Sequence, residues 1–479
     1  MRKKTKIICT IGPASHEIST LVKMMKEGMN VARLNFSHGT YEAHTSLIKN
    51  IRAAAKQSGK IITLLQDLQG PRIRIGDVPK EGVNIKAGET VVFSTAKKVS
   101  GKDIPVTYDK LHKEVKKGES ILVADGLFEF TVLKVVGNRI FTKVINGGTL
   151  TSHKGMNFPS TKLSISSLST KDKADVAFGI SQNVDCIALS FVRSAKDVIE
   201  LRTLIQKEEK KQKKVDVVSP MIIVKIEKKE AVDAFDEILS VADGVMIARG
   251  DLGIEMPAEQ VPLLQKMMIE TCNNAGKPVI VATQMLESMI VNPRPTRAEV
   301  SDVANAVIDK TDAVMLSGES AMGKYPVEAV KIMSKTIAQT ESSALDNYEY
   351  NHQFWNEEQT DEVIAATAAA LSANTSVKMM IVLSMKGATA RLVSKHRPEL
   401  PIVVTTPFAR VARQLNLSWG VRAIEVGEDA TDESMISKAL EYGKKHGYYK
   451  KGDQIILVKG HPRLKKRFSH RSIELFKVA

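Results

Sequence analysis

The chain has 479 residues, too many for one hydrophobic core, and at typical domain sizes this length predicts about three domains. Hydrophobic residues make up 43% and charged residues 26%, a balance typical of soluble globular proteins, and no stretch approaches the ~18 apolar residues of a membrane span. The amino terminus turns directly into a strand pattern and not into a signal peptide, so we expect a cytoplasmic protein without membrane contact.

The net charge is +15, from 69 basic and 54 acidic residues. Much of the excess lies along helices, as in residues 208–214, where charged side chains at a solvated helix end are expected. The densest basic run, residues 461–471, holds one aromatic residue and lacks the stacking platforms of single-strand binders, which disfavours nucleic acid as a partner. The three cysteines lie in apolar patterns without a CxxC pair, so we expect buried thiols and no zinc site.

Eight short apolar segments with strand character alternate with amphipathic helices over the first 320 residues. After the first, nearly every segment ends in polar or charged side chains. This pattern is typical of a (β/α)8 TIM barrel, whose catalytic groups gather at the carboxyl ends of its parallel strands, so we expect one site there. The segments are residues 6–12, 29–36, 61–68, 186–192, 220–227, 244–251, 278–284 and 313–318.

Two breaks in this rhythm predict two further domains. Between the third and fourth strands, short β-rich segments punctuated by Gly and Asn indicate an inserted all-β domain, and a new strand–helix alternation begins near residue 350. We therefore predict an α/β protein with a barrel domain of residues 1–75 and 160–345, an inserted β-domain of 76–159 and a carboxyl-terminal α/β domain of 346–479.

Two carboxylates, Glu227 and Asp251, close the fifth and sixth predicted strands. Adjacent parallel strands lie ~4.8 Å apart, so both side chains can reach one cation, and a hard ion completed by water and substrate oxygens suits Mg²⁺. Lys225 points to the same side as Glu227, because alternate residues of a strand share a face. Its ammonium can neutralise a phosphoryl group or simply pair with Glu227, and paired surface acids are the alternative to a metal site.

Further polar side chains end the other strands. Arg33, Asn35 and Ser37 alternate after the second strand, and the Arg33 guanidinium can fork onto a phosphate or carboxylate. Each alone would be a satisfied strand-end group, so their weight comes from their common position. The remainder are Arg74 beyond the third strand, Thr283 and Gln284 at the seventh, and Ser317 and Glu319 at the eighth, which supply hydroxyls and an acid that could relay a proton.

A competing motif, GESAMGKY at residues 318–325, follows an apolar strand and matches the G-x-x-x-x-G-K phosphate loop of nucleotide hydrolases. That loop needs Ser or Thr next to hold Mg²⁺, and this chain has Tyr325. Pro326 suits the first turn of a helix, so we expect the glycines to serve loop geometry.

At these residues the chain resembles pyruvate kinases, and the likeness extends over essentially its whole length. The resemblance implies a TIM barrel, a mobile β-barrel lid and a carboxyl-terminal regulatory domain, in a homotetramer. It also implies transfer of the phosphoryl group of phosphoenolpyruvate to ADP, giving pyruvate and ATP in the final step of glycolysis. The matching stretches are TKIICTIGPAS, MNVARLNFSHG, ILVADG, NGGTL, HKGMNFP, VKIE, DGVMIARGDLGIE, VIVATQMLESM and DAVMLSGESAMGKYPVEAV.

The same resemblance implies roles for the strand-end residues. Glu227 and Asp251 would ligate Mg²⁺ or Mn²⁺, with backbone N–H groups near Gly250 holding the substrate carboxylate. Lys225 would stabilise the transferring phosphoryl group, and Arg33 would grip the phosphate. The remaining implied roles are a place beside the methylene carbon for Thr283, proton delivery for Ser317 and Glu319, and nucleotide phosphate contacts for Asn35, His38, Arg74 and Lys154, the last carried by the lid.

In the third strand this chain departs from the commonest family pattern, D-T-K-G-P-E-I-R, because it has DLQGPRIR with Arg72 in place of Glu. Most relatives bind K⁺ near the counterparts of Asn35, Ser37, Asp67 and the carbonyl of Leu68. A guanidinium that forks onto Asp67 or phosphate could take over this neutralising task, so we expect that K⁺ is not required. The alternative is a solvated Arg72 that points away.

Two more departures affect ligand contacts. Ser194 stands where many relatives carry a lysine that contacts nucleotide. The last loop of the carboxyl-terminal domain lacks the family's Gly/Thr-rich form, but a Ser/Gly loop at residues 384–391 precedes a predicted helix. A phosphorylated allosteric activator is expected near Ser384 to Thr389, where Lys386, the basic tail and free N–H groups attract anions; a loop that only caps the helix is the alternative.

Two other functions stay open at this point. One is a Mg²⁺-dependent barrel that acts on phosphoenolpyruvate without nucleotide, which a lid carrying HKGMNFP disfavours. The other is an RNA-binding protein that acts through its basic tail. Pyruvate formation with and without ADP would separate both from a pyruvate kinase.

Overall fold

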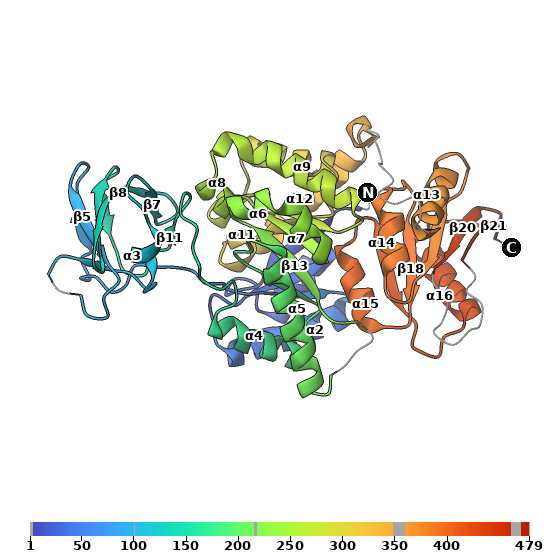
Figure 1. Ribbon diagram of the computed structural model, residues 1–479. Helices are drawn as coiled ribbons and strands as arrows, with labels where there is room; N and C mark the ends of the chain where they lie inside the picture. The colour runs from blue at the N-terminus through green and yellow to red at the C-terminus, as the bar shows by residue number, and fades with distance from the viewer. Residues whose placement is uncertain (1–2, 100, 215–217, 348–359, 461–470, 479) are drawn as a thin grey trace.

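A computed structural model describes the chain in three bodies, with the barrel at the centre, the inserted β-domain at one end and the carboxyl-terminal domain at the other (Figure 1). None of the described helices is long and apolar enough to cross a membrane. The described residues are 3–99, 101–214, 218–347, 360–460 and 471–478.

Eight parallel strands close the central barrel, and each comes from one of the eight predicted segments, which confirms the predicted fold class. Every strand ends before its predicted segment does, so Glu227, Thr283 and Ser317 follow their strands and Asp251 lies in a short helix. Arg33, Asn35 and Lys225 lie within their strands. In chain order the strands are β1 (Lys6–Thr10), β2 (Val31–Asn35), β3 (Thr63–Asp67), β12 (Cys186–Leu189), β13 (Met221–Ile226), β14 (Gly244–Ala248), β15 (Val279–Ala282) and β16 (Ala313–Leu316).

Helices surround the barrel, and several begin at side chains that cap their free N–H groups. Ser169 and Thr296 each form a capping box with the acid three residues on. The helices are α1 (Ile18–Glu27), α2 (Tyr41–Ser58), α4 (Thr170–Ser181), α5 (Ala195–Lys211), α6 (Lys229–Asp233), α7 (Phe235–Val241), α8 (Arg249–Glu255), α9 (Val261–Asn274), α10 (Arg297–Ile308), α11 (Gly318–Ala321) and α12 (Pro326–Glu341), with 3-10 turns at Ala258–Gln260, Glu287–Ile290 and Ala344–Asn347.

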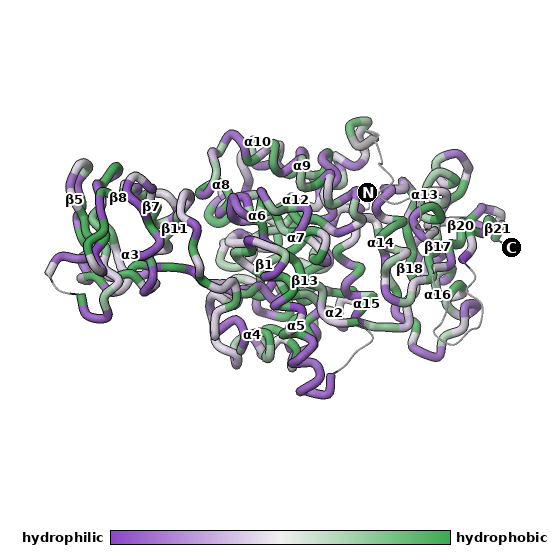
Figure 2. The backbone as a smooth tube through the Cα atoms, in the orientation of Figure 1, coloured by the Kyte–Doolittle hydropathy of each residue, from purple (hydrophilic) through white to green (hydrophobic). Residues whose placement is uncertain are grey.

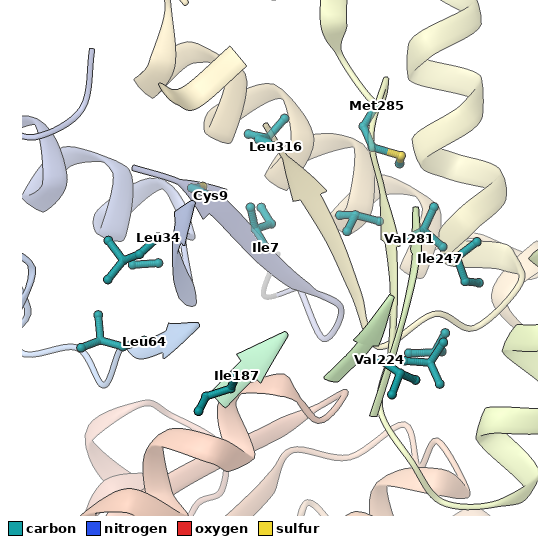
Figure 3. Close-up of a cluster of buried hydrophobic side chains, with 14 of the residues drawn as sticks. Ile7, Cys9, Leu34, Leu64, Ile187, Val224, Ile247, Val281, Met285 and Leu316 are labelled. Carbon is teal, nitrogen blue, oxygen red and sulfur yellow. The ribbon is translucent and has the colours of Figure 1, made fainter. Parts of the chain in front are cut away.

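Strand alternation divides the barrel core into two layers. Ile7, Cys9 and Leu34 point outward and pack with the helices, as Figure 3 shows for one such cluster. Ile8 and Met246 belong to the separate cluster inside the barrel. Figure 2 shows the hydrophobic residues concentrated along these strands. The three cysteines are buried and free, as predicted.

The inserted β-domain has one apolar core between two sheets, with Phe93 edge-on to Phe130 at 5.0 Å. The six-stranded sheet has the order β11-β7-β8-β9-β5-β6, and β10 pairs with β4. The elements are β4 (Val83–Ile85), β5 (Thr90–Ser94), β6 (Ile104–Pro105), α3 (Leu111–Glu114), β7 (Ser120–Val123), β8 (Phe128–Val136), β9 (Arg139–Val144), β10 (Gly148–Leu150) and β11 (Met156–Asn157).

The carboxyl-terminal domain has a five-stranded sheet of order β19-β18-β17-β20-β21. Four of these strands are predicted; the antiparallel edge strand β21 is not. Residues 461–470 of the predicted basic tail lie outside the described residues. The elements are α13 (Thr360–Ala373), β17 (Met379–Leu383), α14 (Ala388–Lys395), β18 (Ile402–Thr406), α15 (Ala409–Gln414), a 3-10 turn (Leu415–Leu417), β19 (Val421–Glu425), α16 (Asp432–Lys445), β20 (Gln454–Lys459) and β21 (Ser472–Lys477).

The carboxyl-terminal domain contacts the amino-terminal ends of the barrel strands. Arg397 bonds the carboxylate of Asp312, just before β16, with its Nη1 2.9 Å from Oδ1. Arg413 bonds Asp185, just before β12, at 2.6 Å. The opposite, carboxyl ends of the strands therefore remain open towards the inserted domain. The residue numbers of the three domain boundaries stay a prediction.

Candidate active site

A buried ion-pair network connects the ends of β2, β3 and β13. Lys225 Nζ lies 2.7 Å from Glu227 Oε1 and 3.6 Å from Asp67 Oδ1. Arg33 Nη2 lies 2.6 Å from Asp67 Oδ2, and its Nη1 donates to Thr10 Oγ1 at 2.8 Å. Lys225 and Glu227 therefore lie on the same side of their strand, as predicted. They also form the ion pair that was the alternative to a phosphoryl-binding role for Lys225.

The charges of this network act on one another because Asp67 and Glu227 are buried and the side chains of Lys225 and Arg33 are only 12% and 11% exposed. Burial alone would lower the pKa of Lys225, but Asp67, Glu227 and Asp251 together raise it above its ordinary value. Burial would raise the pKa of Asp67, yet Lys225 and Arg33 hold it below its usual range. Lys225 is thus a permanent cation at the mouth of the barrel.

Asp251 does not close a strand, which corrects the sequence prediction. Strand β14 ends at Ala248, and α8 begins at Arg249, so Asp251 lies in the first turn of this short helix. The prediction was wrong because the chain turns into a helix directly after β14, so Asp251 lies beyond the end of the strand. Asp251 still acts on Glu227, whose pKa is raised by burial and further by the charge of Asp251.

Thr283 lies beside this helix and shapes its first turn. The N–H of Gly250 donates to Thr283 Oγ1 at 2.7 Å, and this hydroxyl donates to the carbonyl of Ala282 at 2.6 Å. Thr283 and Gln284 have φ of 71° and 54°, which is uncommon for residues other than glycine and occurs often at functional sites. The strand therefore ends at Ala282, and a strained turn places Thr283.

Backbone N–H groups hold the Glu319 carboxylate. Its Oε2 accepts from the N–H of Ser317 at 2.7 Å, and its Oε1 accepts from that of Leu286 at 3.0 Å. Burial raises the pKa of Glu319, although these N–H groups oppose the shift. Glu319 is thus fixed between the ends of β15 and β16, near the turn that carries Thr283.

Glu227 and Asp251 could hold a divalent cation with only two protein ligands. No group of three or more His, Cys, Asp or Glu side chains able to hold a metal occurs among the described residues. Glu227 and Asp251 carry like charges, and the charge of Asp251 raises the pKa of Glu227. A bound cation would relieve this repulsion. Two carboxylates with open positions suit Mg²⁺, which keeps water and substrate oxygens.

The four predicted nucleotide contacts come from two parts of the chain: Asn35 and His38 at the end of β2, and Arg74 and Lys154 on the paired lid connections. Asn35 is half-buried and accepts from the N–H of Ser37 at 3.1 Å, while His38 is exposed. Arg74 donates to the carbonyl of His153 at 2.8 Å, so it ties the two lid connections together. Lys154 is exposed on the lid.

Arg72 does not fork onto Asp67 in this structure, contrary to the sequence prediction. Its Nη2 lies 3.0 Å from Asp125 Oδ1 of the inserted domain. The physical reason is position: Arg72 lies beyond the end of β3, against Gly155 of the returning lid connection. Asp67 is already paired with Arg33 and Lys225.

Three residues of the site carry too weak a sequence signal to be predicted. Ser190 Oγ donates to the carbonyl of Leu68 at 2.7 Å and accepts from Lys225 at 3.0 Å. The N–H of Phe191 donates to Glu227 Oε2 at 2.7 Å. Arg249 forks onto Asp302 at 2.7 and 2.6 Å. Only the polar Ser190 after an apolar run resembles the other strand ends.

The competing phosphate-loop motif has a structural role. Helix α12 begins at Pro326, as expected. A Cβ at Gly318 would lie 2.7 Å from Ile290, and one at Gly323 would lie 2.4 Å from the carbonyl of Glu319. The glycines therefore allow close packing.

Ser194 is the N-cap residue of α5, and its N–H donates to Asp197 at 3.1 Å.

Fold and site together define a (β/α)8-barrel enzyme with a charged pocket at the carboxyl ends of its strands. Family models described as "Pyruvate kinase, barrel domain" and "Pyruvate kinase, alpha/beta domain" match residues 2–330 and 362–470. The chain belongs to the pyruvate kinase family, and it is a phosphotransferase that transfers the phosphoryl group of phosphoenolpyruvate to ADP, giving pyruvate and ATP.

Individual relatives agree with this assignment. A pyruvate kinase of Geobacillus stearothermophilus is 45% identical over 96% of this chain and 78% of its own length. One of Schizosaccharomyces pombe is 43% identical over 96% of this chain and 92% of its own. The crystal structure of a pyruvate kinase from Cryptosporidium parvum matches with a TM-score of 0.91 and 39% identity, covering 100% of this chain and 96% of that one.

Proposed function

We propose that the carboxyl-end site transfers the phosphoryl group of phosphoenolpyruvate to ADP through Lys225, Glu227 and Asp251. The observation that supports these roles is the buried ammonium of Lys225 within 2.7 Å of Glu227 and within the field of Asp251. Phosphoryl transfer needs little beyond positioning and charge stabilisation, and a fixed cation in a water-poor site supplies both.

Glu227 and Asp251 would hold Mg²⁺ or Mn²⁺, which when bound neutralises the substrate's carboxylate and phosphate oxygens. Arg33, already fixed by Asp67, presents its remaining N–H groups to the substrate phosphate. The Gly250 N–H now donates to Thr283 and would turn to a substrate carboxylate.

After phosphoryl transfer the enolpyruvate takes a proton at its methylene carbon. Thr283 is proposed to lie beside that carbon, and Ser317 and Glu319 to supply the proton. A raised pKa lets Glu319 carry a proton nearer neutral pH than an ordinary glutamate could. Asn35, His38, Arg74 and Lys154 are proposed to contact the nucleotide phosphates, with Lys154 carried in by the lid.

A coupled assay for pyruvate, run with and without ADP, tests this function. Pyruvate formation that needs both ADP and a divalent cation supports it. Pyruvate formed equally fast without ADP would favour a phosphatase-like barrel enzyme instead.

We expect activity without K⁺ to be within a few-fold of activity with K⁺, when a tetraalkylammonium salt holds the ionic strength. Asp67 has two cationic partners, Arg33 and Lys225, so its charge is balanced without K⁺. Arg72 pairs with Asp125 in this structure and lines the same cavity as Asp251, so its charge also lies at this side of the site. A hundredfold loss without K⁺, about 2.7 kcal/mol, would contradict this expectation.

The charge-reversed variant Arg72→Glu sharpens this test, because it should create a K⁺ requirement. Arg139→Glu is the matched control: it also removes a lid ion pair, that between Arg139 and Asp103 at 2.7 Å, but far from Asp67. If both variants respond to K⁺ alike, the explanation by Arg72 is wrong.

We expect a sugar phosphate or nucleoside monophosphate to shift the phosphoenolpyruvate saturation curve by binding near residues 384–389. Helix α14 begins at Ala388, and its N-cap, Gly387, has no side chain that could bond the first N–H groups, which favours an anion there. Lys386→Ala should weaken the response severalfold, and the exposed Lys378→Ala should not. If no such ligand shifts the saturation curve, residues 384–389 form a loop that only begins helix α14, and the proposed effector site is wrong.

The remaining parts of the proposal are a cytoplasmic location and a homotetramer. Leu263 is 70% exposed, Val291 57% and Met322 71%, and we propose that another subunit covers these large apolar side chains. Sedimentation analysis measures the assembly directly.

A further inference from the structure

The lid is joined to the barrel by two connections that pair with each other. The N–H of Met156 donates to the carbonyl of Ile73 at 2.9 Å, and that of Ile75 donates to Lys154 at 3.0 Å. Because the connections form one short ribbon, they must turn together when the lid moves. The place where this ribbon is attached to the barrel therefore sets the path of the lid.

One buried carboxylate makes that attachment. Asn157 ends β11, the edge strand by which the ribbon joins the lid sheet, and its Nδ2 donates to Glu255 Oε1 at 3.0 Å. Glu255 is the last residue of helix α8, and its side chain is 1% exposed. The same oxygen accepts from Lys228 Nζ at 3.1 Å. Three segments, the lid connection, α8 and the end of β13, thus meet at one oxygen atom.

A second attachment fixes the chain further on. Arg193 donates to the carbonyls of Leu163 and Ile165. Leu163 and Ile165 pack in or against the apolar core of the lid, so this contact, like that of Asn157, ties the lid to the barrel. Lys154 is exposed and lies three residues before Asn157, about 10 Å along the chain at ~3.3 Å per residue. Asn157 is therefore the nearer of the two attachments to Lys154, and we call it the lid pivot.

Helix α8 links this pivot to the proposed metal site. Asp251 lies in its first turn and Glu255 at its end, four residues and about one helical turn apart. Asn157, Lys228 and Asp251 also line the same cavity of about 30 Å³, which has room for about one water molecule. A shift of α8 at Asp251 would therefore also move Glu255, which bonds Asn157.

We propose that Glu255 is a positioning residue that fixes the lid pivot at Asn157 and couples occupancy of the Asp251 turn to the approach of Lys154. The proposal rests on the function above, because it takes Lys154 as a nucleotide contact. It predicts that loss of the Glu255–Asn157 bond weakens ADP binding more than phosphoenolpyruvate binding.

Steady-state kinetics of Glu255→Ala, Asn157→Ala and the double variant test the coupling. Each single change should raise KM for ADP about tenfold, with KM for phosphoenolpyruvate within about threefold of wild type. The double variant should be no worse than the worse single one, because both remove the same bond. Glu255→Gln should restore most of the ADP affinity, since its amide oxygen can accept from Asn157. Additive effects, or a Gln variant as poor as Ala, would overturn the proposal.

Limited proteolysis of the lid gives a readout that needs no turnover. In wild type, phosphoenolpyruvate with Mg²⁺ should slow lid cleavage severalfold, and in Glu255→Ala this protection should be lost. Arg139→Gln, which breaks an exposed ion pair within the lid, is the control and should keep the protection. Equal protection in Glu255→Ala would reject the inference. Absence of pyruvate formation by the wild type would instead reject the proposed function.

Discussion

Replacing Asp251 by alanine should remove nearly all turnover, by about a thousandfold or more, while the fold survives. Asp251 supplies one of two carboxylates for the proposed cation, and Glu227 alone would hold Mg²⁺ weakly. The first turn of α8 does not depend on Asp251, because Arg249 is fixed by Asp302 and Gly250 by Thr283. We therefore expect kcat to fall even in saturating Mg²⁺.

The stability of Asp251→Ala should move in the opposite direction to its activity. The charge of Asp251 opposes ionisation of Glu227, so its removal relieves repulsion in the apo protein. We expect Tm without metal to be unchanged or higher, as at other sites where function costs stability. Glu259→Ala, an exposed acid on the following 3-10 turn, is the control and should change neither quantity. Wild-type-like kcat in saturating Mg²⁺ would exclude Asp251 from the metal site.

The barrel could be predicted because its strands are buried on both faces and leave continuous apolar runs such as those of β13 and β14. The pairing of Lys225 with Glu227 follows from strand alternation alone. The inserted domain was recognisable by the break in that rhythm. Edge strand β21 was missed, because it is half exposed and follows a strongly charged run.

Features that depend on tertiary contacts could not be predicted. The run VMIARGD gives no sign that the chain turns into a helix at Arg249, so Asp251 was placed on a strand. The direction of Arg72 depends on Asp125, which is distant in sequence and reaches it only through the lid. Ser190 is one small polar residue after an apolar run, and its hydrogen bonds to Leu68 and Lys225 form only when the barrel strands come together.

Replacing Lys225 by methionine should lower kcat about a thousandfold and change KM for phosphoenolpyruvate only a few-fold. Methionine keeps an unbranched apolar stem, so the packing changes little while the charge is lost. That charge matters chiefly as the phosphoryl group leaves one oxygen for another, so the loss falls on the transition state. An effect confined to KM would contradict this role.

The same substitution should also destabilise the apo protein, because it leaves buried carboxylates without their cation. Asp67 keeps Arg33, and Glu227 keeps the N–H of Phe191, so we expect a loss of about 3 kcal/mol and not unfolding. Mg²⁺ should restore part of the lost Tm in Lys225→Met, since a bound cation replaces the missing charge beside Glu227. Lys229→Met removes an exposed ion pair with Asp233 and is the matched control, with kcat, Tm and the Mg²⁺ response all expected near wild type. A Lys225→Met variant that is inactive but gains nothing from Mg²⁺ would separate the lysine from the metal site and place its role in the fold alone.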